Sequence, residues 1–308
     1  MKIGIITDGL RNLNFDNVLS FAAENNITYL EFGCGNYSSA PHLNLDKLLN
    51  SKKARKEFQA KINDHGLKIS ALNCSGNQLK PGKYGKQHDL VVRKTFKLAN
   101  LFDLNRVVMM SGLPGGPGDK NPNWIITASP KENANILKWQ WEKIAIPYWK
   151  DLYEYGSNLG INKISLENHG MQLIHNLETL ITLRDRIGIN IGANFDPSHI
   201  FWMGGDPLKM LPLMKDLIYH VHAKDTKLDS KKIAYNTLLE PKSYDDVETR
   251  SWNYCTLGNG HDQNWWHKFV KGLKNVGYDD VLSIEHGDRL VKNIDGVMQT
   301  IKLLKKII

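Results

Sequence analysis

Short apolar runs rich in isoleucine, valine and leucine alternate along the chain with longer amphipathic stretches. The short runs predict buried β-strands, because brief apolar segments bounded by turn residues are typical of strands covered on both faces. Eight segments fit this description: 2–7, 29–33, 67–73, 106–111, 163–168, 190–196, 218–223 and 281–285. The intervening stretches predict helices over 15–25, 45–65, 94–102, 131–159, 177–187, 207–216, 264–276 and 291–308.

This alternation predicts an α/β fold in which every strand is followed by a helix. Eight such units in 308 residues are typical of a single parallel eight-stranded (β/α)8 TIM barrel, with its active site at the C-terminal face of the strands. We therefore expect one domain over residues 1–308. An open doubly wound sheet is disfavoured because the first turn, residues 7–12, lacks the G-x-G-x-x-G fingerprint. Two long connections, 112–130 and 225–263, follow strand ends and are predicted to form pocket walls.

Composition narrows the class of protein. Hydrophobic residues make up 41% of the chain and charged residues 23%, which is typical of a globular protein and excludes a disordered one. No apolar run is long enough for a membrane span, so a membrane protein is excluded. The N-terminal residues lack the pattern of a signal peptide, and three cysteines without C-x-x-C spacing fit a reducing compartment. We therefore expect a cytoplasmic location.

The chain is basic, with a formal net charge of +8. Such a charge permits an anionic ligand, for example a sugar phosphate or a nucleic acid. However, the lysines are spread through the helical segments, so we interpret the charge as a basic solvated surface. Net charge therefore supports no functional conclusion by itself.

Potential metal ligands stand at four consecutive strand ends: Glu167, Asp196, His222 and Glu285. Residues at the carboxyl ends of neighbouring barrel strands converge on the barrel mouth, so these side chains are expected to surround one divalent cation. Carboxylates pointed at one another would repel without a cation between them. An oxygen-rich set with one nitrogen favours Mn²⁺, with Mg²⁺, Co²⁺ and Zn²⁺ left open.

The strand-end motifs resemble those of the xylose isomerase-like TIM barrel superfamily of sugar phosphate isomerases and epimerases. The resemblance covers nearly the whole chain and is most specific in WQWE (139–142), IPYWK (146–150), GANFDPSH (192–199), HVHAKD (220–225) and LSIEH (282–286). In ketose 3-epimerase types, the corresponding Glu, Asp, His, Glu set binds one divalent metal. The resemblance implies that Glu167 and Glu285 also transfer protons.

Such a pair suits sugar isomerisation or epimerisation. A metal that binds the carbonyl oxygen and the neighbouring hydroxyl stabilises the enediolate formed when one glutamate removes a proton, and the other can return it. Three neighbours of the ligands, His199, His220 and Asp225, are predicted to bind substrate, although Asp225 could instead orient a histidine. Lys224 is a lone basic loop residue, for which solvation is the commoner state.

The expected substrate is a small carbohydrate, and no nucleic-acid or membrane partner is expected. Three alternatives remain. A lyase or dehydratase acting on a keto-sugar or cyclitol would use the same enediolate chemistry. An apurinic endonuclease shares the barrel, but its three-zinc cluster needs more ligands than these strand ends offer. The third is a non-catalytic sugar-binding barrel, against which the intact Glu167 and Glu285 count. The sugar, its phosphorylation and homo-oligomer formation are left open.

Overall fold

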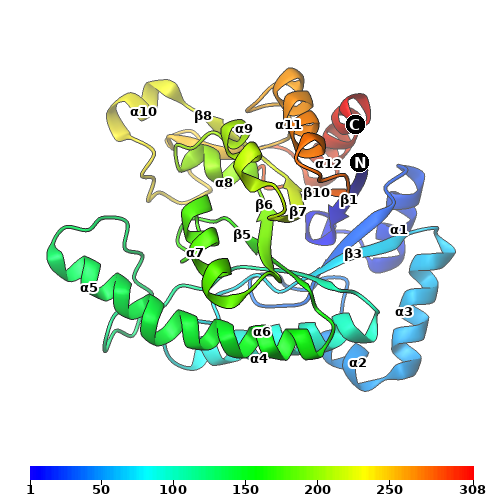
Figure 1. Ribbon diagram of the computed structural model, residues 1–308. Coiled ribbons are helices and arrows are strands. Elements are labelled where there is room, and N and C mark those ends of the chain that lie inside the picture. Colours follow the sequence, from blue (N-terminus) through cyan, green and yellow to red (C-terminus); the bar gives the residue numbers. More distant parts are fainter. The chain divides into compact units, whose positions relative to one another are not determined.

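The β-strands form one closed parallel barrel of eight strands. A computed structural model describes residues 1–308 (Figure 1), and the strand order around the barrel is β1-β10-β7-β6-β5-β4-β3-β2. The predicted TIM-barrel fold is therefore confirmed. The barrel strands are β1 (Lys2–Ile6), β2 (Tyr29–Gly33), β3 (Lys68–Asn73), β4 (Arg106–Met109), β5 (Lys163–Glu167), β6 (Ile191–Phe195), β7 (Ile218–Ala223) and β10 (Val281–Ile284).

Helices alternate with these strands, as Figure 1 shows along the colour gradient. They are α1 (Phe15–Glu24), α2 (Leu45–Asn50), α3 (Lys52–Asp64), α4 (Lys83–Leu101), α5 (Lys131–Trp139), α6 (Ile146–Asn158), α7 (Leu177–Ile187), α8 (Pro197–Trp202), α9 (Pro207–Met210), α10 (Ser230–Asn236), α11 (Gln263–Asn275) and α12 (Asn293–Ile307). Short 3-10 turns cover Thr7–Leu10 and Leu211–Met214. None of the helices has the length and apolar character needed to span a bilayer.

Several helices differ from the sequence prediction for local reasons. The predicted helix 45–65 is two helices, because Ser51 is extended and its hydroxyl caps the start of α3 by accepting a hydrogen bond from the Ala54 amide at 3.1 Å. Helix α4 begins at Lys83 rather than at residue 94. Its first half buries only Gly85 and Val92, so its apolar stripe is too weak to predict a helix there. Helix α8 was not predicted, although Asp196 followed by Pro197 is a typical helix start.

The predicted helix 131–159 is continuous but contains a π-helical segment, Gln140–Ala145, between α5 and α6. Gln140 in this segment is fully buried. Its side-chain amide donates hydrogen bonds to the carbonyl groups of Pro114 and Asn123, at 3.0 Å and 2.7 Å. A π-helical turn frequently serves to place a particular side chain, and here it attaches the glycine- and proline-rich connection 112–130 to the helix.

The chain packs as two compact units. Residues 1–31, 58–70 and 195–308 form the first unit, and residues 32–57 and 71–194 form the second. In the first unit, Phe195 packs on Phe269 with ring centroids 5.7 Å apart. In the second unit, the fully buried Trp149 and Phe96 belong to the core. The assignment of residues 1–308 to one domain stays a prediction.

The connection 225–263 belongs to the first unit and has structure of its own. Its strands β8 (Asp225–Leu228) and β9 (Trp252–Cys255) pair antiparallel outside the barrel, and α10 lies between them in the chain. Stacked rings hold the hairpin, because Trp252 lies on Trp202 of α8 with centroids 4.8 Å apart. The hairpin is therefore anchored on the helix that follows β6.

Candidate metal centre and active site

The first unit brings three of the predicted metal ligands together. Asp196 directly follows β6, His222 lies in β7, and Glu285 directly follows β10. Parallel pairing of β10 with β7 sets their heights, because Ser283 is the register partner of His222. One ligand atom from each of Asp196, His222 and Glu285 lies within 4.8 Å of the others. Asp196 and His222 are buried, and the Glu285 side chain is 25% exposed.

Direct contacts link these three residues to a lysine and to a second histidine. The Nδ1 atom of His222 lies 2.8 Å from Oε2 of Glu285. The Lys224 ammonium donates to Oε1 of Glu285 at 2.5 Å and lies 4.0 Å from Oδ2 of Asp196. Nε2 of His199 lies 3.1 Å from the same Asp196 oxygen. The cluster is therefore one continuous network of charged and titratable groups.

Electrostatics keep the carboxylates of this cluster ionised. Burial by itself raises the pKa of Asp196, but the nearby His199 and Lys224 outweigh it and lower the pKa. Burial likewise opposes ionisation of Glu285, whereas Lys224 and His222 hold the pKa of this carboxyl well below its usual range. Burial lowers the pKa of His222, but Glu31 and Glu285 raise it well above the ordinary value.

The donor set fits a divalent cation. Two carboxylates, one buried and one part-exposed, and an imidazole nitrogen within 4.8 Å are the ligand types that hold Mn²⁺, Co²⁺ or Zn²⁺ in proteins. A buried charge is costly unless it is paired. In this cluster the Lys224 ammonium forms an ion pair with the Glu285 carboxylate. The types of ligand are thus suited to a divalent ion, whose identity they do not determine.

Asp196 has a second, structural task. Its Oδ1 atom accepts a hydrogen bond from the Ser198 amide at 2.8 Å and so caps the N-terminus of α8. Its Oδ2 atom faces His199 and Lys224. One carboxylate therefore both begins the helix that carries His199 and lines the candidate metal centre.

Glu167, the fourth predicted ligand, belongs to the second unit. It is the last residue of β5 and is 4% exposed. Its register partner on β6 is Asn194, two residues before Asp196. The roles of Glu167 as a ligand and as a proton carrier stay predictions.

The predicted substrate-binding residues have different surroundings. His199 is buried, and its Nδ1 atom lies 3.0 Å from the Tyr254 hydroxyl. His220 is buried two residues before His222 and contacts Glu31 at 2.8 Å. Binding of substrate by these two histidines stays a prediction.

Asp225 is fully buried at the start of the 225–263 connection. Its carboxylate accepts hydrogen bonds from the backbone amides of Gly258, Gly260 and His261, and from Nδ1 of His261 at 2.8 Å. These bonds hold the end of the connection against its beginning and account for the burial of the carboxylate. The alternative expectation was that Asp225 orients a histidine, and His261 is the histidine that its carboxylate contacts. Direct binding of substrate by Asp225 stays a prediction.

Three residues of the cluster were missed or misjudged from the sequence. Lys224 was expected to be solvated, but it is 7% exposed and paired with Glu285, because the strand carries it into the cluster. Tyr254 of β9 places its ring 4.4 Å from the Lys224 ammonium, so the connection contributes an aromatic contact. Glu31 was not noticed, although a charged residue inside a strand that is otherwise apolar signals a special role.

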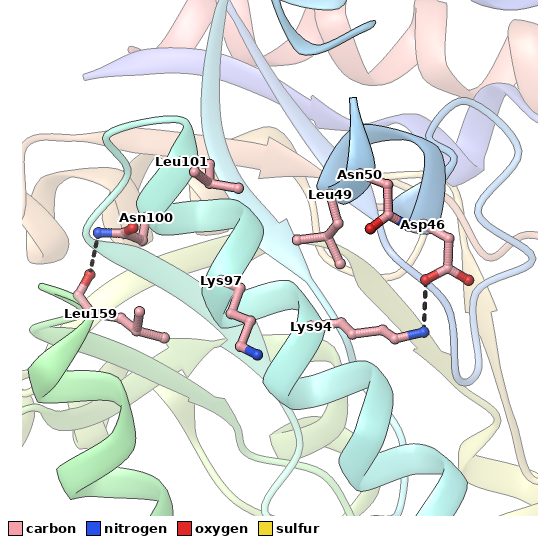
Figure 2. A pocket seen from close by; sticks show the side chains of 8 residues that line it. All are labelled: Asp46, Leu49, Asn50, Lys94, Lys97, Asn100, Leu101 and Leu159. Atoms are coloured by element: carbon pink, nitrogen blue, oxygen red, sulfur yellow. Dashed lines mark hydrogen bonds and ion pairs between the residues drawn. The ribbon is translucent and has the colours of Figure 1, made fainter. Parts of the chain in front are cut away.

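A separate surface pocket lies in the second unit (Figure 2). Its volume is about 550 Å³, and α2 and α4 contribute most of its lining residues. Lys94 pairs with Asp46 at 2.6 Å, and Asn100 donates to the Leu159 carbonyl at 3.0 Å. These polar groups are partnered within the pocket wall, and none of the predicted site residues lines it.

A family model described as xylose isomerase-like TIM barrel matches residues 19–307, and the chain belongs to this family. The resemblance inferred from the strand-end motifs is confirmed. One relative, the uncharacterized protein YfiH of Bacillus subtilis (strain 168), is 44% identical over 311 residues, which cover 100% of this chain and 99% of YfiH.

Solved structures show the same fold at low sequence identity. The probable 3-DHS dehydratase AsbF of Bacillus anthracis is similar with a TM-score of 0.68 and 17% identity, covering 99% of each chain. A D-tagatose 3-epimerase-like protein is similar with a TM-score of 0.64 and 19% identity, covering 100% of this chain and 98% of that one. Both similarities show a shared fold.

Proposed function

We propose that this protein is a divalent-metal-dependent isomerase or epimerase of a sugar, a sugar phosphate or a related keto-sugar. The observation that carries the proposal is the grouping of the buried Asp196 and His222 with the part-exposed Glu285 at the carboxyl ends of barrel strands. Glu167 is the fourth ligand in this proposal, which its position at the end of β5 supports.

A divalent cation bound by these four residues, with Mn²⁺ the preferred candidate, would polarise the carbonyl group of a sugar and acidify the adjacent carbon. Glu285 is the proposed proton acceptor. Lys224 and His222 hold its two oxygens and keep the carboxylate ionised. Glu167 is the proposed partner that returns a proton to the sugar. Epimerisation requires the two glutamates to act on opposite faces of the sugar.

His199 is the predicted substrate contact that the geometry supports best. Its ring lies between Asp196 and Tyr254, with Nε2 3.1 Å from the carboxylate and Nδ1 3.0 Å from the hydroxyl. Both ring nitrogens thus have protein partners, so a bound sugar hydroxyl would take the place of one of them. The substrate class that fits is a small polyhydroxylated carbonyl compound.

A dehydratase or lyase is the second candidate, and one observation favours it. The Lys224 ammonium lies 2.5 Å from Oε1 of Glu285, so a proton donor stands beside the residue proposed as the base. An elimination needs this combination, because the base removes a proton while the donor protonates the departing hydroxyl. Both reactions begin with removal of a proton from the carbon beside the carbonyl group.

Incubation with a panel of ketoses, phosphorylated ketoses and keto-cyclitols in deuterated water tests the proposal. An isomerase or epimerase will place deuterium on carbon beside the carbonyl, and several time points will reveal internal proton transfer. A dehydratase will instead release water and form an unsaturated carbonyl product. Product formation with all carbon-bound hydrogen retained contradicts both. An abasic DNA duplex serves as a control, and its efficient cleavage favours an endonuclease.

A further inference from the structure

Another carboxylate, Glu31, is buried beside His222 and has no part in the chemistry described above. Glu31 lies in β2 and is completely buried. Its Oε2 atom is 2.8 Å from Nε2 of His220 and 2.7 Å from the Ser283 hydroxyl. Nε2 of His222 is 3.1 Å from Oε1 and 3.2 Å from Oε2. One carboxylate thus contacts two imidazoles and a hydroxyl.

The direction of these hydrogen bonds follows from the chemistry of the groups. Glu31 is completely buried, and its carboxylate oxygens lie 2.7–3.2 Å from two imidazole nitrogens and a hydroxyl, each of which can donate a hydrogen bond. An ionised carboxylate only accepts hydrogen bonds. Both imidazoles therefore donate to Glu31 through Nε2–H, and the Ser283 hydroxyl also donates. This arrangement therefore places a proton on Nε2 of His222.

The opposite nitrogen of His222 faces the candidate metal centre. Nδ1 lies 2.8 Å from Oε2 of Glu285, whereas Nε2 faces Glu31. A metal ligand must offer a nitrogen lone pair, and the hydrogen bond at the other nitrogen determines which one is available. With Nε2 protonated toward Glu31, a neutral His222 presents its Nδ1 lone pair to the site.

The barrel keeps this contact rigid. His220 and His222 are two residues apart in β7 and therefore share a face of the strand. Ser283 of β10 is the register partner of His222, so a third donor reaches Glu31 from the neighbouring strand. All three partners of Glu31 are at most 1% exposed.

We propose that Glu31 is a positioning residue that holds His222 with Nε2 protonated and so presents Nδ1 as the ligand for a divalent metal. This inference rests on the metal site of the proposed function and deepens it. It adds a residue 191 positions from His222 in the chain that acts on the metal only through the histidine.

Nuclear magnetic resonance of the wild-type chain tests the assignment without any mutation. Protein labelled with ¹⁵N-histidine and loaded with diamagnetic Zn²⁺ is expected to show His222 coordinated through Nδ1, with a slowly exchanging proton on Nε2. Coordination through Nε2 overturns the inference. A second bound ion shared by Glu31, His220 and His222 also overturns it, because the three residues would then be ligands themselves.

The second test compares Glu31→Gln with the matched control Ser283→Ala, using calorimetric titration with Mn²⁺ and Zn²⁺. Gln keeps the shape of Glu but removes the charge and one acceptor, whereas Ser283→Ala removes one donor and leaves the contact of Glu31 with His222. We expect Glu31→Gln to weaken metal binding about 10- to 100-fold, the usual cost of losing such an outer contact. The same variant should lose the slowly exchanging proton on Nε2 of His222. Ser283→Ala should change the metal affinity and this proton only slightly.

These outcomes separate the inference from the function on which it rests. Wild-type affinity and an unchanged His222 spectrum in Glu31→Gln overturn the inference alone. A wild-type chain that binds no divalent metal overturns the proposed metal site and this inference with it. If Glu31→Gln does not fold, as judged by circular dichroism, the wild-type spectrum still distinguishes Nδ1 from Nε2 coordination.

Discussion

Replacing Asp196 should separate its two tasks, metal binding and helix capping. Asp196→Ala removes both the carboxylate and the cap, because Oδ1 accepts the hydrogen bond from the Ser198 amide at 2.8 Å. Asp196→Asn removes the charge but keeps an oxygen at the cap position, where Asn is as effective as Asp. Because both variants lose the negative charge, the difference in stability between them reports mainly the cap.

The expected magnitude follows from this single hydrogen bond. Loss of an N-cap costs about 0.5–2 kcal/mol, which corresponds to a decrease in the thermal unfolding midpoint of about 1–3 °C for a chain of this size. Differential scanning calorimetry of chelator-treated protein measures the decrease without the stabilisation that bound metal adds. Asp196→Asn should therefore unfold about 1–3 °C above Asp196→Ala.

Metal analysis of the same two variants tests the ligand assignment. Both should lose bound metal after dialysis against trace Mn²⁺, because the site in each has lost a charged oxygen donor. Wild-type metal content in both variants refutes the assignment of Asp196 as a ligand. Equal unfolding midpoints for the two variants refute the reasoning about the cap.

Two further predictions concern the proposed proton carriers. Glu167→Gln and Glu285→Gln should each lose at least about 100-fold in kcat at saturating cation, the usual scale for a positioned acid or base. A near wild-type rate in either variant excludes that glutamate as an obligatory proton carrier. Lys224 lowers the pKa of Glu285, so Lys224→Met should raise this pKa and move the acidic limb of the pH–kcat profile to higher pH; an unmoved or lowered limb contradicts the role of Lys224.

Local sequence pattern determined the barrel strands and the heights of the predicted ligands. Runs such as Ile218–Ala223 and Tyr29–Gly33 have the same bounds in the sequence prediction and in the structure, because strand formation by a buried apolar run depends mainly on neighbouring residues. Parallel strands present their carboxyl ends at one edge. The grouping of Asp196, His222 and Glu285 could therefore be anticipated from their places in the chain.

Helix boundaries depended on contacts that local pattern does not contain. The first half of α4 buries only Gly85 and Val92, so its apolar stripe was too weak to mark the start at Lys83. The helix 131–159 was predicted without its π-helical turn, because the partners of Gln140 lie 17 to 26 residues away in the connection 112–130. Helix α8 is the exception, since its N-cap and proline were visible at Asp196 and Pro197.

The sequence by itself thus determined the fold class and the chemical types of the residues at the strand ends. Only the tertiary structure decided which buried charges meet. Glu31 reaches His220 across 189 residues of sequence, and Lys224 joins Glu285 across 61. A charged side chain has the same local signature whether it is solvated or paired, and burial makes pairing necessary. Because burial and pairing arise when distant strands close the barrel, the ion pair at Glu285 and the orientation of His222 are properties of the folded chain.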